Sequence, residues 1–145
     1  MKSIRTGVYA LLKYQDKIVT ILKGRGPFIG LYDLPGGKIE HGEENIESLK
    51  RELFEEIGLK ENDYEIEKLL TIEEDFVKHI WNGEEKDEHL IAIIYEVKII
   101  NNDFDLDFIE EGGDANGIKL IDIDDKEVGK TNILKKVMKN YETNI

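Results

Sequence analysis

Residues 36–59 read GGKIEHGEENIESLKRELFEEIGL, which is a glycine turn followed by an acidic, amphipathic helix. Glu52, Glu55 and Glu56 are spaced i, i+3 and i+4, so at about 100° per residue they lie on one helix face. A separate apolar stripe, centred roughly 110° away, comprises Ile46, Leu49, Leu53 and Ile57. The helix can therefore pack one face on a core while the other presents carboxylates to a cleft.

Clustered carboxylates are hard oxygen ligands of the kind that Mg²⁺ or Mn²⁺ takes, together with substrate phosphates and water. Taken alone, such a cluster is more often the solvated face of a surface helix. Gly36 and Gly37 stand before the helix, where glycine lets the chain turn sharply and bring a backbone carbonyl close to a ligand. A plain turn is the alternative there. The sequence around these residues is needed to distinguish a metal site from a solvent-exposed acidic helix.

The wider pattern is Gly37, five residues, Glu43, seven residues, and then Arg51-Glu52-Leu53-Phe54-Glu55-Glu56-Ile57-Gly58-Leu59. It resembles the signature of the Nudix hydrolases, G-x5-E-x7-R-E-U-x-E-E-x-G-U with U aliphatic, and every defined position is matched. We call residues 37–59 the Nudix box. The resemblance implies an α+β (mixed α/β) fold, with a mixed sheet sandwiched between helices, and a single domain over residues 1–145.

The same resemblance implies a role for each polar residue of the box. Glu55 and Glu56 would bind the metal, and the carbonyl of Gly36 would be a further ligand. Glu52 would be the general base or a ligand of a second ion, because family members differ on which carboxylate takes the proton. The planar fork of Arg51 would orient the catalytic carboxylates better than a lysine would. The expected catalytic residues are thus Arg51, Glu52 and Glu55, and Glu43 is expected to be mainly structural.

Family members often supply one more carboxylate from a loop after the box. The candidate here is the run from Phe108 to Asp114, in which Glu111 is the first choice as a metal ligand, followed by Glu110 and then Asp114. A solvated acidic loop is the alternative. Phe28 and Tyr32 are substrate-binding candidates because aromatic rings stack on bases, as is Trp81, although isolated aromatics more often pack in a core.

The implied reaction is attack of water on a diphosphate linkage of a nucleoside diphosphate derivative, with Mg²⁺ or Mn²⁺ as cofactor. The only prolines are Pro27 and Pro35, so the downstream prolines of many ADP-ribose hydrolases and of the NADH-cleaving branch are absent. Phe76 stands near the place of a tyrosine found in many dinucleoside polyphosphate hydrolases, so that branch is disfavoured. What remains resembles MutT-like enzymes that act on nucleoside triphosphates.

Several alternatives stay open. The alternative substrates are ADP-ribose, nucleotide sugars and dinucleoside polyphosphates. An alternative of another class is a Nudix module that binds a nucleotide without cleaving it. Such modules commonly lose a carboxylate of the box, and none is lost here.

Composition sets further bounds. The 145 residues carry a net charge of −12, which argues against binding to a nucleic-acid duplex and favours a small nucleotide partner. The absence of cysteine excludes disulfides, thiolate metal sites and a cysteine nucleophile. No apolar run is long enough for a signal peptide or a membrane span, so a cytoplasmic protein is expected. The oligomeric state is expected to be either monomer or homodimer.

Hydrophobic patterning and turn residues predict the elements. Helices are expected at Glu44–Ile57, with Gly58 at its end, and at Asn132–Tyr141. Gly24–Asp33 and Asn101–Asn116 are expected to be loops. The expected strands are Ile4–Lys13, Lys17–Lys23, a short one within residues 34–39, Glu65–Trp81, Glu88–Ile100 and Gly117–Ile123.

Overall fold

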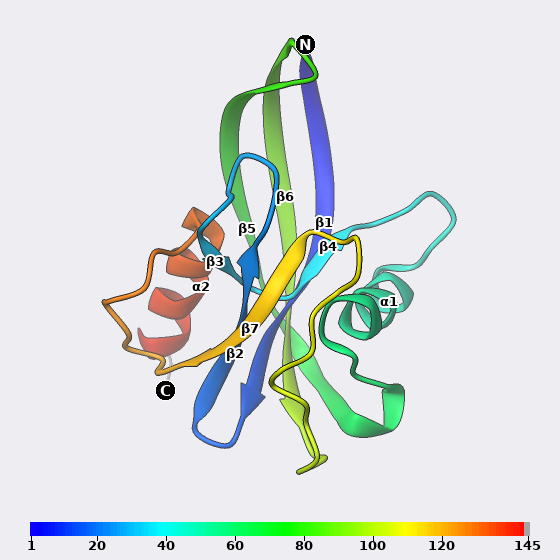
Figure 1. Cartoon of the computed structure of the whole chain (residues 1–145), viewed down its shortest axis with the longest axis vertical. Helices are drawn as coiled ribbons and strands as arrows, with labels where there is room; N and C mark the ends of the chain where they lie inside the picture. The colour runs from blue at the N-terminus through cyan, green and yellow to red at the C-terminus, as the bar shows by residue number, and fades with distance from the viewer. Residues whose placement is uncertain (144–145) are drawn as a thin grey trace.

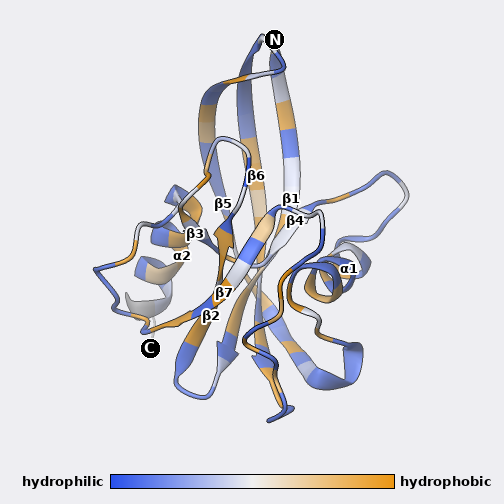
Figure 2. Ribbon diagram, in the orientation of Figure 1, coloured by the Kyte–Doolittle hydropathy of each residue, from blue (hydrophilic) through white to orange (hydrophobic). Residues whose placement is uncertain are grey.

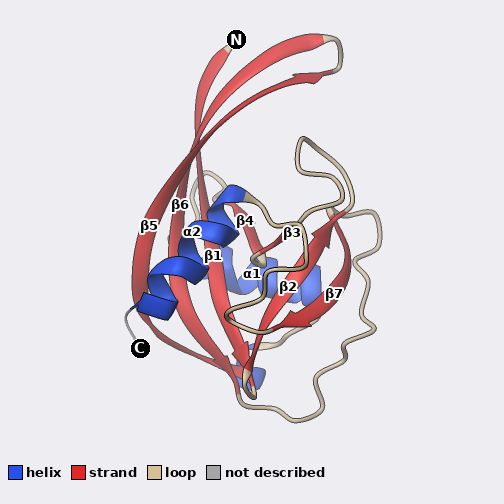
Figure 3. Ribbon diagram, turned by 90° about the vertical axis from the view of Figure 1, so that its left-hand side faces the viewer, coloured by secondary structure: helices blue, strands red, loops and turns tan. Residues whose placement is uncertain are grey.

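A seven-stranded mixed sheet forms the centre of the molecule, with one long helix on each face (Figures 1 and 3). The computed structural model describes residues 1–143. The strands are β1 (Lys2–Tyr14), β2 (Lys17–Lys23), β3 (Tyr32–Asp33), β4 (Gly36–Lys38), β5 (Tyr64–Trp81), β6 (Glu84–Ile99) and β7 (Ala115–Ile121). The helices are α1 (Asn45–Ile57), the short 3₁₀ helix η1 (Glu61–Asp63) and α2 (Asn132–Thr143). No helix within residues 1–143 is long and apolar enough to cross a membrane.

The strand order is β3-β2-β1-β6-β5, with β4 added on β1 and β7 on β2. β1 runs parallel to β6 and antiparallel to β2 and β4, so the sheet is mixed. The pairing of β1 with β4 sets Tyr9 opposite Gly36 and Val8 opposite Gly37. The start of the Nudix box is therefore fixed to the central strand.

Alternation along β1 divides the core into two layers. Val8, Ala10 and Leu12 join the cluster that contains Leu49, Leu53 and Ile57 of α1, whereas Tyr9 and Leu11 join the cluster beneath α2. Hydrophobic and hydrophilic residues accordingly alternate along the long strands, whereas the turns are mostly hydrophilic (Figure 2). The apolar stripe predicted for α1 is the face that packs on the sheet.

The ends of α1 follow from local chemistry. Gly58 has φ 74°, and the last turn closes with the amides of Gly58 and Leu59 donating to the carbonyls of Phe54 and Leu53. This is a left-handed cap, which glycine adopts without steric cost. The cap stops the helix directly after the glutamates of the box.

The expected elements are all present, with some changes in their bounds. β6 begins at Glu84 rather than Glu88, because the Asn82-Gly83 turn closes a tight hairpin with β5. The last strand is Ala115–Ile121, two residues earlier than expected, and α2 extends to Thr143. The predicted loop Gly24–Asp33 ends in the two-residue strand β3, which pairs with β2.

β5, β6 and the first residues of β1 extend well beyond the rest of the sheet (Figure 1). We call this extension the arm, comprising residues 2–6, 76–81 and 84–90. Its three strands are held by continuous pairing from Lys2 with Asp87 to Trp81 with Glu84. The arm forms one wall of the cavity described below.

Candidate active site

The site is built on the turn between β4 and α1. Gly36 has φ 146°, and a Cβ there would lie 2.2 Å from the Val8 carbonyl oxygen, so only glycine fits. Its amide donates a 2.7 Å hydrogen bond to Glu56 Oε1. A Cβ on Gly37 would lie 2.7 Å from the carboxyl carbon of Glu52. The two glycines thus leave room for both carboxylates to lie directly against the backbone.

Arg51 holds the other carboxylates of the box in place. Its Nε and Nη2 donate to the two oxygens of Glu43 at 2.8 and 3.0 Å. Its Nη1 donates to Glu52 at 2.9 Å and to Glu55 at 3.2 Å. The bond with Arg51 lowers the pKa of Glu43 to about 2. Arg51 thus contacts three carboxylates of the box, those of Glu43, Glu52 and Glu55.

Glu56 is a buried carboxylate and Glu52 a partly buried one, in a crowded acidic site. Burial raises the pKa of Glu52 to about 7, against the opposing effect of Arg51. Burial also raises the pKa of Glu56, which is only 4% exposed, although the amide of Gly36 stabilises its charged form. The charge of Glu52 raises the pKa of Glu56 further. Glu55 lies at the open edge of the site, with 45% of its side chain exposed.

The loop after β6 brings Glu110, rather than Glu111, to this group. The charge of Glu110 contributes to the raised pKa values of both Glu52 and Glu56. The Glu110 side chain folds over Gly113, where an added Cβ would lie 1.7 Å from its carboxyl carbon, and it accepts a 3.3 Å hydrogen bond from the amide of Ala115. Glu111 is exposed. The second choice of the sequence analysis is therefore the one that faces the box.

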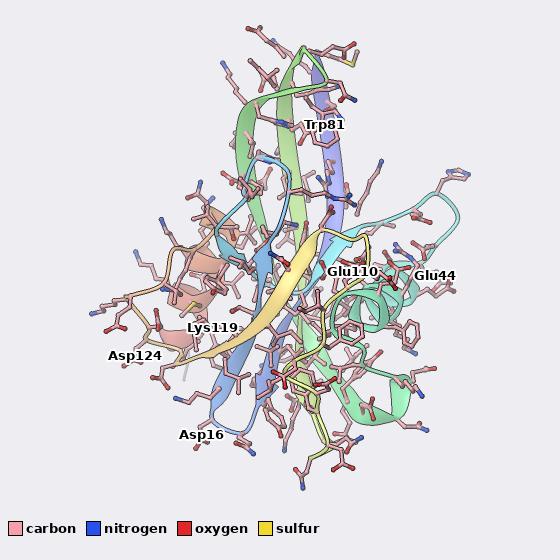
Figure 4. The ribbon with its side chains drawn as sticks, in the orientation of Figure 1. Asp16, Glu44, Trp81, Glu110, Lys119 and Asp124 are labelled. Carbon is pink, nitrogen blue, oxygen red and sulfur yellow. The ribbon has the colours of Figure 1, made fainter. Side chains whose placement is uncertain are left out.

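Two aromatic residues hold this loop against the domain. The Phe108 ring would lie 2.9 Å from a Cβ added to Gly58, so it packs on the glycine cap of α1. The ring of Phe104 packs edge-on against Tyr14 at 5.3 Å. The irregular segment between β6 and β7 is thus fixed at points that leave Glu110 beside α1, where Figure 4 labels it.

The donor set fits a hard divalent cation. Within residues 1–143, no three acidic or histidine side chains are already gathered at metal-ligand spacing. Glu52 and Glu55 instead share Nη1 of Arg51, and Glu56 accepts from Gly36. Burial of several carboxylates side by side is unfavourable when they are charged, and a bound cation would offset that cost. The residues that would hold it are Glu52, Glu55, Glu56, Glu110 and the carbonyl of Gly36.

A cavity of about 530 Å³ adjoins this site. Tyr9, which pairs with Gly36, lines the end nearest the box, and so does Lys23, whose charge lowers the pKa of Glu56. The arm forms one wall, and the loop of residues 25–28 forms another. Phe28 lines the cavity, as expected for a substrate-binding residue, and Trp81 does too. Tyr32 instead packs against the core cluster beneath α2 and is not among the lining residues.

Most of the polar residues that line the cavity did not emerge from the sequence, among them Arg5, Lys23 and His79. Arg5 is one of three arginines and shares the odd-numbered face of β1 with Tyr9, which is the signal that was available. His79 lacked any ligand spacing to another histidine and gave no such signal. The buried carboxylate of Asp33, which accepts from the hydroxyl of Thr131 at 2.8 Å, also lines the cavity.

Comparisons with known proteins agree with this geometry. The chain matches the NUDIX domain model over residues 1–138. A protein of Methanocaldococcus jannaschii described as an ADP-ribose pyrophosphatase is 27% identical over 118 residues, which is 80% of this chain. The chain spans only 60% of the length of that relative.

Solved structures share the fold. The MutT NUDIX hydrolase of Burkholderia pseudomallei has a TM-score of 0.70 at 25% identity, with 95% of this chain and 98% of that chain covered. A NUDIX hydrolase of Nitrosomonas europaea also has a TM-score of 0.70, at 21% identity, with 98% and 90% covered. The family match spans nearly the whole chain, and both helices pack on the mixed sheet as expected. Glu52 and Glu56 of the box lie against the Gly36-Gly37 turn. This chain belongs to the Nudix (NUDIX domain) family.

Proposed function

We propose that this protein is a pyrophosphohydrolase that cleaves a diphosphate linkage in a nucleoside diphosphate derivative and depends on Mg²⁺ or Mn²⁺. The observation that carries the proposal is the carboxylate pair of Glu56, which is buried, and Glu52, which is partly buried, set against the Gly36-Gly37 turn near a cavity. Such a pair is unfavourable in a purely structural helix but suits a cation and the phosphates it binds.

Each residue has a distinct task in this reaction. Glu52 takes a proton from the attacking water, and its pKa of about 7 suits a base that works near neutral pH. Glu55, Glu56, Glu110 and the Gly36 carbonyl would hold the metal, with Glu52 beside them. A divalent ion bound there would neutralise charge on the phosphoryl oxygens and make water more acidic. Arg51 positions Glu52 and Glu55 through the contacts of its Nη1.

The cavity supplies binding for the rest of the substrate. Lys23 lines the cavity, and its charge also lowers the pKa of Glu56. It would therefore bind a substrate phosphate that extends from the metal site toward the cavity. Tyr9, Phe28 and Trp81 provide aromatic surface for a nucleoside. We place nucleoside triphosphates first among the substrates, because the MutT protein of Burkholderia pseudomallei covers nearly the same length at the same fold.

ADP-ribose is the second candidate substrate. It is favoured by the Methanocaldococcus relative, whose description names that compound. The downstream proline typical of many ADP-ribose hydrolases is absent from this chain, which is why we place it second.

A hydrolysis screen with product identification tests the proposal. The panel comprises nucleoside triphosphates, ADP-ribose, nucleotide sugars and dinucleoside polyphosphates, each with Mg²⁺ and with EDTA. We expect a nucleoside monophosphate and inorganic pyrophosphate from a triphosphate, and no turnover in EDTA. Glu52→Gln should lower kcat by about 10²–10³. Full turnover in EDTA would rule out the metal-dependent reaction.

Glu47→Gln is a matched control for Glu52→Gln. Glu47 is an exposed glutamate in the first turn of α1, and it stands at an unconstrained position of the box. Its kcat should stay within about twofold of wild type, as expected for an exposed charge. Nucleotide binding without any hydrolysis across the panel would instead favour the non-catalytic binding module.

A further inference from the structure

The cavity beside the Nudix box collects basic side chains in an acidic protein. The chain has a net charge of −12 and only three arginines, yet two of those arginines line this one cavity. Its basic lining residues are Arg5, Lys23, Arg25 and Lys86, against the three carboxylates of Asp33, Glu88 and Asp114. A net positive cavity on a negative molecule is a feature that anionic ligands explain.

Arg5 stands apart from the other two arginines. Arg25 is paired with Asp114, and Arg51 is paired with Glu43, Glu52 and Glu55. Arg5 forms no ion pair with any residue that the structure describes, and its buried Nε has no hydrogen-bond partner. Leaving a buried, charged donor unsatisfied is costly, so a group that completes its bonding is expected to bind there.

A second unpartnered donor lines the same cavity. Nε2 of His79 is buried without a hydrogen bond, although Glu88 Oε2 lies 3.5 Å away. His79 stands on β5 and Arg5 on β1, so the two come from different strands of the arm. The unsatisfied groups thus belong to one wall of the cavity.

Arg5 is too far from the turn of the box to serve the scissile diphosphate. Tyr9 pairs with Gly36, whereas Arg5 pairs with Leu90, four residues further along β1. At about 3.3 Å per residue, the backbone of Arg5 lies roughly 13 Å from Tyr9, the residue opposite Gly36, although β1 also pairs with the box nearer to Arg5, at Gly7 opposite Lys38. Lys23, not Arg5, is the cavity cation whose charge reaches Glu56. Arg5 therefore addresses a different part of the ligand.

We propose that Arg5 binds a second phosphate of the substrate, a phosphate monoester that is separate from the diphosphate being cleaved. His79 donates to the same group, and the nucleoside lies between the two phosphate sites, against Tyr9 and Phe28. The inference rests on the proposed function only in placing the scissile diphosphate at the Nudix box. It names the substrate class as nucleotides with an additional phosphate on the half that enters the cavity.

Trp81 allows this site to be tested without turnover. It is the only tryptophan of the chain, it lines the cavity, and it stands on the arm, away from Glu110 at the side of α1 (Figure 4). Inorganic phosphate is titrated against the protein in EDTA at constant ionic strength, and Trp81 fluorescence is followed. Acetate is titrated in parallel to separate phosphate from carboxylate.

Three variants make the experiment decisive. Arg5→Met should weaken phosphate binding at least about tenfold, as expected for loss of a charged hydrogen-bonding partner. Arg25→Met removes the same charge from the same cavity but from an exposed residue already paired with Asp114, so it should change binding by less than about threefold. Arg5→Lys retains the charge and should keep part of the affinity, which guards against a folding defect in Arg5→Met.

The outcomes separate this inference from the proposed function. A fluorescence change that is absent in the wild type, equal for acetate and phosphate, or unaffected by Arg5→Met overturns the phosphate site. Phosphate binding that depends on Arg5, in a protein that hydrolyses neither the substrate panel nor the same nucleotides carrying an additional phosphate on the ribose, supports the site and overturns the reaction instead.

Discussion

Replacing Glu52 by glutamine should stabilise the metal-free protein at pH 8 while lowering the kcat of the metal-loaded enzyme. The pKa of Glu52 is raised from 4.5 to about 7, so the folded state holds a proton that the unfolded state has released. Between these two values the native state binds more protons, and stability falls as the pH rises. Above pH 7 the full cost of the buried charge is present, and glutamine removes it without changing the shape of the side chain.

The size of the effect follows from the shift. One pKa unit corresponds to about 1.4 kcal/mol, so a rise from 4.5 to about 7 sets an upper bound of about 3 kcal/mol. The Glu52 side chain is 14% exposed, and solvent screening reduces this to about 1–2 kcal/mol. In a chain of this length that corresponds to roughly 3–7 °C in Tm. Arg51 keeps both bonds to Glu43 in the variant, so its own charge stays paired.

Thermal unfolding at pH 5 and pH 8, with EDTA and with Mg²⁺, measures this directly. We expect Glu52→Gln to gain stability at pH 8 in EDTA and to gain much less at pH 5, which is only just above the unfolded-state value of 4.5. Mg²⁺ should raise the Tm of the wild type more than that of the variant, because the ion binds the native carboxylates. Glu47→Gln is again the matched control and should show neither change.

A clear result would refute the reasoning. If Glu52→Gln is no more stable than the wild type at pH 8 in EDTA, the carboxylate is not desolvated at a cost to the fold. No cation would then be needed to offset the cost of burying the Glu52 charge.

Three further changes test other parts of the site. Gly37→Ala places a Cβ 2.7 Å from the Glu52 carboxyl carbon, so we expect kcat to fall at least about tenfold with little change in Tm, because a flexible side chain can move aside. Glu110→Gln should raise the Mg²⁺ concentration for half-maximal activity, whereas Glu111→Gln should not; the reverse result would move the ligand by one residue. Thr131→Val removes the buried donor to Asp33, so urea unfolding should show a loss of about 1–3 kcal/mol, and an unchanged midpoint would mean that Asp33 finds another partner.

The box helix was predictable because its information is local. The i, i+3, i+4 spacing of the glutamates and the separate stripe of Leu49, Leu53 and Ile57 require only helical geometry, and the structure places the stripe in the core. Gly58 ends the helix for the same kind of reason, since its backbone conformation favours glycine. Elements that depend on distant partners were less well defined. β3 has only two residues and exists because β2 offers it an edge, which no pattern of two residues can indicate.

The post-box carboxylate shows where local reasoning ends. Glu110 and Glu111 are adjacent, equally acidic and equally close to the glycines, so the sequence offers no physical ground for choosing between them. The choice is made by packing of Phe108 on Gly58, about fifty residues away in the chain, and by the space above Gly113 into which the Glu110 side chain folds. A contact between an aromatic ring and a helix cap thereby helps to decide which carboxylate faces the box.

Arg5 extends the same argument to the cavity. Its position on β1 was predictable, and so was its place on the same face as Tyr9. Its lack of an ion pair was not predictable, because that depends on which side chains from other elements lie around it. β5 and β6 place His79, Glu88 and Leu90 along this wall, yet none of them pairs with Arg5 among residues 1–143. The charge of Arg5 lowers the pKa of Asp33 and of Asp114, but neither carboxylate forms an ion pair with it, and its buried Nε has no hydrogen-bond partner. An unpaired arginine inside a cavity therefore indicates a ligand more strongly than the arginine's presence in the sequence does.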